Sequence, residues 1–135
     1  NVDAICMWLL KNPHSYEVLV APNLYGDIIS DLAAQMVGGL GFGCSGNIGT
    51  KLAVFEPSHG SAPKYAGQYK VNPLATILAA KMMLEWLGEQ AKAEKIERAC
   101  AAVIKAGTVR TYDMGGSSTT LEMGEAVARA LGREG

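Results

Sequence analysis

The sequence has no excess of charge of either sign and no long hydrophobic run. Its 135 residues carry 12 Lys and Arg against 13 Asp and Glu, a formal net charge of −1. This balance gives no electrostatic basis for binding nucleic acid or an anionic membrane surface. No apolar run approaches the roughly 18 residues that a membrane-spanning helix needs. We therefore expect no nucleic-acid partner, no membrane partner and a cytoplasmic location.

Signals for paired cysteines are also absent. Cys6, Cys44 and Cys100 are odd in number, widely spaced and set among apolar or small residues, and there is no CxxC motif. This pattern predicts buried free thiols in a reducing compartment, with a disulfide or a metal role as the alternative.

The beginning of the chain lacks both an initiator Met and the charged-then-apolar pattern of a signal peptide. It opens as "NVDAICMWLL", which is the pattern of an amphipathic helix. Hydrophobic residues make up 49% of the chain, ample for a core, but the pattern below contains too few strands to cover its helices. We therefore expect the C-terminal part of a longer protein.

Apolar periodicity and turn residues predict an α/β protein. Helices are expected at residues 2–11, 24–37, 73–87, 89–106 and 120–132, the last behind a capping box of Thr119 and Glu122. Short buried strands are expected at 16–21 and 52–56. Six glycines between positions 38 and 49 predict an irregular loop that lets backbone approach a ligand. The order of elements fits a layered fold whose other strands lie elsewhere.

Two aspartates, Asp27 and Asp31, lie four positions apart within the otherwise apolar helix "NLYGDIISDLAAQMV". At helical pitch their carboxylates share one face about a turn apart, where like charges repel each other. A hard cation such as Mg²⁺ or Mn²⁺ reverses that repulsion, since it prefers oxygen ligands. The alternative is a pair of acids that stabilises the positive end of the helix dipole.

Two loops contain further candidates for binding. In "HGSAPKYAG", His59 is followed by small residues that leave backbone N–H groups accessible, and then by Lys64 and Tyr65. Such a loop could hold a nucleotide, with a ring against the adenine and the lysine on a phosphate. In "TYDMGG", Tyr112 and Asp113 precede a glycine pair. An ordinary surface loop and an ordinary turn are the alternatives.

Taken together, "NLYGDIISD" before a double glycine, "HGSAPKYAG", and "VNP" at the start of a helix resemble the isocitrate and isopropylmalate dehydrogenases in order and spacing. The resemblance covers essentially the whole chain. It implies the three-layer α/β/α fold of that family, with this chain as its C-terminal portion. Residues 1–37 would end the small, dimer-forming domain, and residues 38–135 would return into the large, cofactor-binding domain.

The resemblance also implies roles for individual residues. Asp27 and Asp31 match the family's metal-binding aspartates, and Asp3 matches a third that completes the site of the neighbouring subunit in a homodimer. Positions lining the dinucleotide site are matched by Leu40, Gly41, Glu56, His59, Gly60, Ser61, Ala62, Lys64, Tyr65, Val71, Asn72, Tyr112 and Asp113. The family's catalytic tyrosine and lysine would lie upstream of Asn1, so no residue here is assigned a catalytic role.

The implied cofactors are Mg²⁺ or Mn²⁺ and either NADP or NAD. Lys64 and Tyr65 match residues that meet the 2′-phosphate in the NADP branch, whereas NAD-preferring members usually carry an acid at the position of Lys64. Tyr112 and Asp113 also match the NADP pattern. However, an arginine expected shortly after the tyrosine is missing, and "DMGG" resembles the NAD-type turn "DLGG". We favour NADP, with NAD as the alternative.

The implied reaction is metal-dependent oxidative decarboxylation of a 2-hydroxy acid, a small-molecule substrate. We expect isocitrate, converted to 2-oxoglutarate and CO₂ as in the tricarboxylic acid cycle. The alternatives are isopropylmalate, homoisocitrate or tartrate dehydrogenase, or a non-catalytic regulatory subunit of a hetero-oligomeric isocitrate dehydrogenase.

Overall fold

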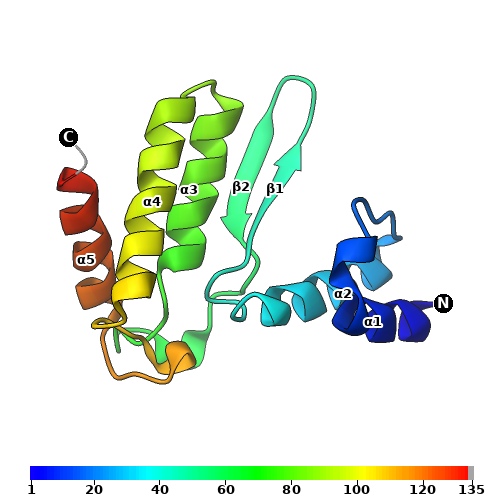
Figure 1. Ribbon diagram of the computed structural model, residues 1–135, viewed down its shortest axis with the longest axis horizontal. Helices are drawn as coiled ribbons and strands as arrows, with labels where there is room; N and C mark the ends of the chain where they lie inside the picture. The colour runs from blue at the N-terminus through cyan, green and yellow to red at the C-terminus, as the bar shows by residue number, and fades with distance from the viewer. Residues whose placement is uncertain (134–135) are drawn as a thin grey trace. The chain divides into compact units, whose positions relative to one another are not determined.

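The computed structural model describes residues 1–133, which form two compact units that divide between Gly39 and Leu40. The division lies two residues from the domain boundary expected from the sequence; the identity of the two units as domains of a larger enzyme stays a prediction. The first unit contains α1 (Val2–Lys11), a 3₁₀ turn (Pro13–Ser15) and α2 (Asn23–Met36). The second contains β1 (Cys44–Ile48), β2 (Ala53–Pro57), α3 (Leu74–Trp86), α4 (Gln90–Ala106) and α5 (Thr120–Gly132), with 3₁₀ turns at Pro63–Tyr65 and Tyr112–Met114 (Figure 1).

The first unit is a pair of contacting helices with a small core. Its buried hydrophobic residues are Leu9 and Ala34, whereas Val18 and Val20 are 82% and 96% exposed. The strand predicted at 16–21 is wrong: these residues have no ladder partner among those that the structure describes. A β-strand needs a neighbouring strand to bond its backbone, so β-branched composition alone did not suffice.

The second unit begins with an antiparallel hairpin in which Cys44 pairs with Pro57 and Ile48 with Ala53. The strand predicted at 52–56 is confirmed within one residue as β2. The loop predicted over 38–49 is wrong in its second half, because β1 occupies residues 44–48. Gly46 fits this strand because a Cβ there would lie 3.1 Å from the Phe55 ring. Pairing with β2 therefore overrides the low strand propensity of the glycines.

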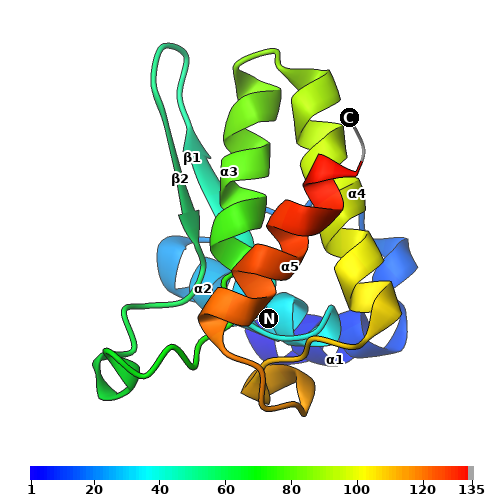
Figure 2. The ribbon, with the colours of Figure 1, turned by 90° about the vertical axis from the view of Figure 1, so that its left-hand side faces the viewer.

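Successive layers cover the hairpin in the second unit: α3 packs on the hairpin, α4 on α3, and α5 on α4 (Figures 1 and 2). The two predicted helix ends at Gly88 and Gly107 are confirmed, and both glycines adopt the left-handed conformation, with φ of 80° and 64°. The buried core cluster lies between α3, α4 and α5 and contains Leu74, Ala99, Cys100, Val103, Met123 and Val127. No helix in the described part of the chain is long and apolar enough to cross a membrane.

All three cysteines are free thiols, but the sequence prediction that all three are buried is correct only for Cys100. Cys100 is 2% exposed, and its burial raises the pKa of the thiol to about 11. Cys6 and Cys44 are half-buried. Because the reactive species is the thiolate, Cys100 is the least reactive kind of cysteine, a small apolar core residue.

The predicted capping box is present at the start of α5. The Glu122 carboxylate accepts hydrogen bonds from the backbone N–H and the hydroxyl of Thr119, and these bonds lower the pKa of Glu122. We expect Thr119→Ala to reduce the free energy of unfolding by about 1 kcal/mol. A lowered carboxyl pKa stabilises the protein above the pKa of the unfolded state, and this contribution is lost as pH falls through the folded value.

Urea titrations of the full-length protein between pH 3 and pH 7 test this. Glu122→Gln should flatten the acid limb of the stability profile, because glutamine does not titrate. Glu125→Gln on the exposed face of the same helix is the matched control, and an equal flattening there would contradict the assignment.

Candidate functional site

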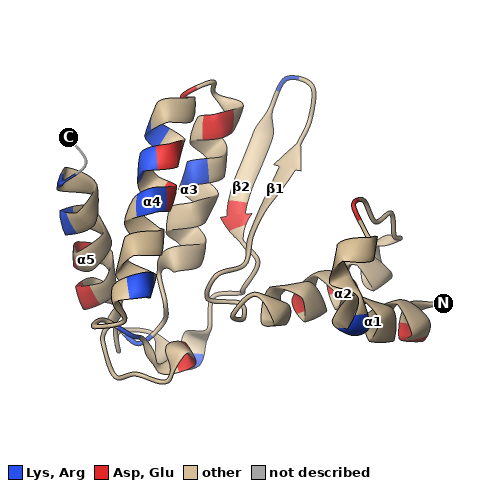
Figure 3. Cartoon of the chain, viewed as in Figure 1, with Lys and Arg blue, Asp and Glu red and all other residues tan. Residues whose placement is uncertain are grey.

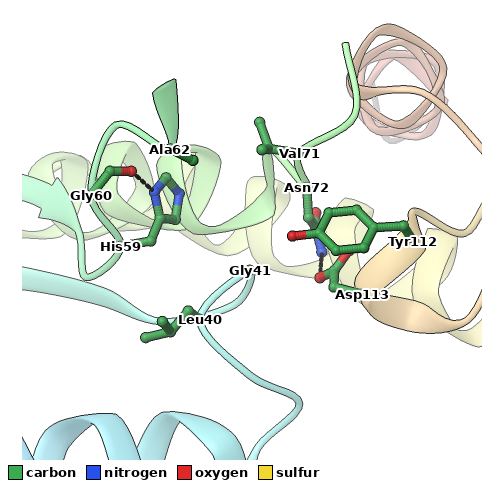
Figure 4. Close-up of a pocket in the computed structure, with 9 residues that line it drawn as sticks. All are labelled: Leu40, Gly41, His59, Gly60, Ala62, Val71, Asn72, Tyr112 and Asp113. Atoms are coloured by element: carbon green, nitrogen blue, oxygen red, sulfur yellow. Dashed lines mark hydrogen bonds between the residues drawn. The ribbon is translucent and has the colours of Figure 1, made fainter. Parts of the chain in front are cut away.

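The second unit contains a pocket of about 410 Å³ between the loops that lead into and out of its helices (Figure 4). Four segments distant in sequence supply its walls: the chain before β1, the loop after β2, the residues before α3 and the turn before α5. The lining residues are Leu40, Gly41, His59, Gly60, Ala62, Val71, Asn72, Tyr112 and Asp113. All nine belong to the set that the sequence resemblance assigned to a dinucleotide, so the structure brings most of that set together.

Gly41 lets two walls of the pocket meet. A Cβ at this position would lie 2.3 Å from Asp113 Oδ2 and 3.0 Å from Asn72 Nδ2. The Gly41 carbonyl also accepts a 2.9 Å hydrogen bond from the Ala75 N–H, which ties this segment to the start of α3. Position 41 therefore takes glycine because of close packing rather than a special backbone conformation.

A hydrogen-bond chain through Asn72 holds the wall opposite His59. Asn72 is 4% exposed; its Nδ2 donates to Asp113 Oδ2 at 3.0 Å, and its Oδ1 accepts from the Leu74 N–H at 3.0 Å. The fully buried Thr111 donates its hydroxyl to Asp113 Oδ1. The Asn72 side chain therefore satisfies the first backbone N–H of α3 and joins that helix to the turn before α5.

The loop after β2 forms the other wall. The His59 Nδ1 lies 2.9 Å from the Gly60 carbonyl oxygen, so a proton on that nitrogen is donated there and leaves Nε2 free to accept. Ala62, which also lines the pocket, adopts the left-handed conformation with φ of 44°. His59 and Tyr112 lie on opposite sides of the pocket (Figure 4). Two flat side chains together with glycine and alanine in the same lining suit the binding of a flat heterocyclic ring.

The other four residues assigned to the dinucleotide lie outside this lining. Ser61 and Tyr65 line a neighbouring pocket of about 350 Å³. Lys64 is exposed, and its Nζ lies 4.8 Å from the centre of the Tyr65 ring. Glu56 is on β2, where Oε1 accepts a 3.3 Å hydrogen bond from Asn47 Nδ2.

Sequence reasoning missed Lys70. Its Nζ lies 5.1 Å from the centre of the Tyr65 ring and 5.2 Å from that of Tyr112, and the two ring centres are 5.6 Å apart. Burial and the neighbouring Tyr65 raise the pKa of the Tyr112 hydroxyl, which therefore stays protonated at neutral pH. A lysine on each side of Tyr65 in one short loop was the available signal, but only folding brings Tyr112 beside them.

The three aspartates assigned to a metal lie in the first unit. Asp27 and Asp31 are exposed, one turn apart on α2, and their side chains make no hydrogen bond or ion pair with other described residues. Asp3 is on α1, where Oδ1 accepts a 2.8 Å hydrogen bond from the Ala4 N–H. Figure 3 shows acidic residues on both helices. Within residues 1–133 no three acidic, His or Cys side chains gather as a metal site, so Asp3 does not join the other two within one chain.

Comparison with known proteins gives a consistent result. The family described as "Isocitrate/isopropylmalate dehydrogenase" matches residues 1–127. An isocitrate/homoisocitrate dehydrogenase of Thermus thermophilus is 52% identical over 130 residues, 96% of this chain and 39% of the relative. A 3-isopropylmalate/3-methylmalate dehydrogenase of Methanocaldococcus jannaschii is 47% identical over 133 residues, 98% of this chain and 40% of the relative.

A solved structure agrees with these relatives. The crystal structure of isocitrate dehydrogenase from Methylococcus capsulatus superposes with a TM-score of 0.91 at 46% identity, over 96% of this chain and 39% of that one. This chain therefore spans about two fifths of the length of the proteins that it matches.

Proposed function

The chain belongs to the isocitrate/isopropylmalate dehydrogenase family and has part of that family's fold, and from this we propose a function for the protein that contains it. That protein is a metal-dependent NAD(P) dehydrogenase that oxidatively decarboxylates a 2-hydroxy acid, with isocitrate as the preferred substrate. The observation that carries the proposal is the pocket, which brings together nine of the residues that the sequence resemblance assigned to a dinucleotide.

The pocket fits the adenosine part of a dinucleotide. His59 and Tyr112 offer flat faces for a purine, and Asn72 and Asp113 offer polar atoms at its edge. Gly41 and Gly60 keep side chains out of the space between them, and a Cβ on Gly60 would meet nothing within 4 Å. Small residues beside aromatic and amide groups are a common composition for a cofactor site.

The first unit fits a divalent cation. The carboxylates of Asp27 and Asp31 make no hydrogen bond or ion pair with other described residues. Mg²⁺ is commonly held by one or two carboxylates, and water and substrate complete its coordination shell. A cation bound there would supply Lewis-acid stabilisation of the oxygen charge that develops during oxidation and decarboxylation. We propose that Asp3 contributes to the site of the partner subunit in a homodimer.

In the proposed reaction, the residues of this chain bind the cation and the cofactor. Asp27 and Asp31 would hold the cation, which would help to orient the substrate hydroxyl and carboxylate. The pocket would hold the adenosine end of the cofactor, whose nicotinamide would supply the hydride acceptor of the proposed reaction. The proton-transfer groups are the tyrosine and lysine expected in another part of the full-length protein.

Initial rates of the full-length protein with Mg²⁺, D-isocitrate and either NADP⁺ or NAD⁺ test the proposal. We expect turnover with a preference for NADP⁺, because Lys64 stands where NAD-preferring relatives usually carry an acid. A rate with isopropylmalate, homoisocitrate or tartrate but not isocitrate would change the substrate and keep the reaction. No rate with any of them, while metal and nucleotide still bind, would indicate a regulatory subunit.

The 135 residues alone should show no dehydrogenase activity. The metal and cofactor positions are present in them, but the family's catalytic tyrosine and lysine are not matched. The assay is NADPH formation by the purified 135-residue chain at high enzyme concentration, beside the full-length protein as positive control. Turnover by the short chain would show that proton transfer does not depend on those groups.

A further inference from the structure

The loop after β2 forms one wall of the pocket, but most of its hydrogen bonds stay within the loop. Positions 59–71 supply four of the nine lining residues, which are His59, Gly60, Ala62 and Val71. The Tyr65 N–H donates to the Ala62 carbonyl at 2.9 Å, and the Gln68 side chain donates to the Lys64 carbonyl at 2.8 Å. Such bonds shape the loop, but they do not fix it against the opposite wall of the pocket.

Thr120, the first residue of α5, attaches this loop to another element. Its backbone N–H donates to the Tyr69 carbonyl oxygen at 2.7 Å, and its hydroxyl donates to the Val71 carbonyl oxygen. Among residues 1–133, no other hydrogen bond joins the backbone of positions 59–71 to a different element. A ring contact between Tyr65 and Tyr112, with centres 5.6 Å apart, adds only a side-chain contact.

The backbone conformation of Tyr69 indicates that this attachment is under load. Tyr69 has a φ of 48°, in the left-handed region that bulky residues rarely occupy. Its side chain is 57% exposed, so burial of the ring does not compensate for the conformation. An unfavourable conformation persists only where the surrounding structure holds it. The bond from the Thr120 N–H to the Tyr69 carbonyl is such a restraint.

Thr120 is also continuous with the opposite wall of the pocket. Tyr112 and Asp113 lie in a turn whose two ends are joined by hydrogen bonds. The Ser118 N–H donates to the Arg110 carbonyl at 2.8 Å, and the Arg110 N–H donates to the Ser118 hydroxyl at 3.2 Å. Thr120 follows this closed turn by two residues. Its two bonds therefore connect the wall formed by the loop to the wall formed by the turn.

We propose that Thr120 is a positioning residue for the cofactor pocket, and that its hydroxyl holds the loop at the separation from the turn before α5 that an adenosine group needs. A side chain without the hydroxyl leaves the Val71 carbonyl without this donor and frees the end of the loop that lines the pocket. The effect on ligand binding rests on the proposed function, whereas the attachment of the loop does not.

Two measurements on the full-length protein test the proposal: amide hydrogen exchange by mass spectrometry and calorimetric titration with adenosine 5′-monophosphate. Thr120→Val keeps the branched shape and removes the hydroxyl. Exchange in residues 59–71 and the Kd for the monophosphate should each rise about fivefold, the usual effect of one net hydrogen bond. Thr120→Ser should restore both. Thr76→Val, at an exposed threonine in the first turn of α3, is the matched control and should change neither.

Thr119→Val distinguishes the attachment of the loop from a general weakening of α5. The Thr119 side chain bonds to Glu122 within the helix and makes no bond to the loop. This variant should lower the Tm, because α5 loses its cap, but exchange in residues 59–71 and the Kd should stay the same. Equal rises in the Thr119 and Thr120 variants would overturn the role of the Thr120 hydroxyl.

The remaining outcomes separate this role from the proposed function. Unchanged exchange in the loop of Thr120→Val would overturn the attachment and the positioning role together. Faster exchange with an unchanged Kd would overturn the positioning role and leave the adenosine pocket intact. Failure of the unaltered protein to bind the monophosphate would overturn the adenosine pocket and the positioning role with it, while the exchange rates would still show whether Thr120 holds the loop.

Discussion

Asp27→Asn in the full-length protein should reduce metal-dependent turnover at least about a thousandfold, because a neutral amide replaces one of two carboxylates that neutralise the cation. The Asp27 side chain is exposed and has no hydrogen-bond or ion-pair partner among the described residues, so its removal should leave the fold intact. The measurement is kcat/KM with Mn²⁺ or Mg²⁺, beside direct titration of Mn²⁺ binding. Near-normal rates would contradict the ligand assignment.

Glu17→Gln is the matched control for Asp27→Asn. Glu17 is an exposed acid of the same unit that makes no hydrogen bond or ion pair with other described residues, and its replacement should change neither rate nor metal affinity. Equal loss in both variants would indicate a general effect of net charge.

Asp3 allows a sharper form of this experiment. If Asp3 completes the partner's site, Asp3→Asn and Asp27→Asn chains should each be inactive alone. Co-expressed, they should recover about a quarter of the normal activity, since half of the dimers are mixed and each mixed dimer has one intact site. No recovery would place Asp3 with the aspartates of its own chain, and an active Asp3→Asn protein would place it outside the metal site.

Asn72→Ala should reduce both stability and dinucleotide binding. Asn72 is 4% exposed, and the change removes its bonds to Asp113 and to the Leu74 N–H, which leaves the N–H of the fully buried Leu74 unsatisfied. We expect a loss of about 2–3 kcal/mol in the free energy of unfolding, the sum of a lost helix cap and a lost buried hydrogen bond. KM for the dinucleotide should rise about tenfold or more, because Asp113 and Tyr112 lose their support.

Urea unfolding and initial-rate kinetics of the full-length protein measure the two effects separately. Asn47→Ala on β1 is the matched control: Asn47 is exposed, and its one side-chain bond, to Glu56, is 3.3 Å long. A destabilised Asn72→Ala protein with an unchanged KM would remove Asn72 from the cofactor site and leave it only its role in the fold.

The local elements of this protein were predictable from the sequence where short-range chemistry decides them. The apolar periodicity of α1 and α2, the glycines that end α3 and α4, and the Thr119–Glu122 box all act within a few residues. The motifs that indicate the family are likewise contiguous stretches of sequence. Local hydrogen bonds and steric limits on φ depend only on neighbouring residues, so they can be predicted without knowledge of the fold.

Two of the predictions that were wrong involve β-pairing, which is not local. The segment 16–21 has strand composition but no partner in the described chain, whereas glycine-rich residues 44–48 form a strand because β2 lies beside them. Whether a segment is a strand depends on a second segment that supplies its hydrogen bonds. Composition alone does not contain that information.

By itself, the sequence determined the helices, their caps, the family, and which residues are candidates for metal and cofactor. Only the tertiary structure decided which of these candidate residues lie close to one another in space. It joined Asn72 to Asp113 across 41 residues, placed Tyr112 beside Tyr65, and brought Lys70 to both rings. It also showed that Gly41 is needed for close packing against Asp113. The physical reason is that a binding site depends on distances between atoms remote in the chain, and the packing of α3, α4 and α5 sets those distances.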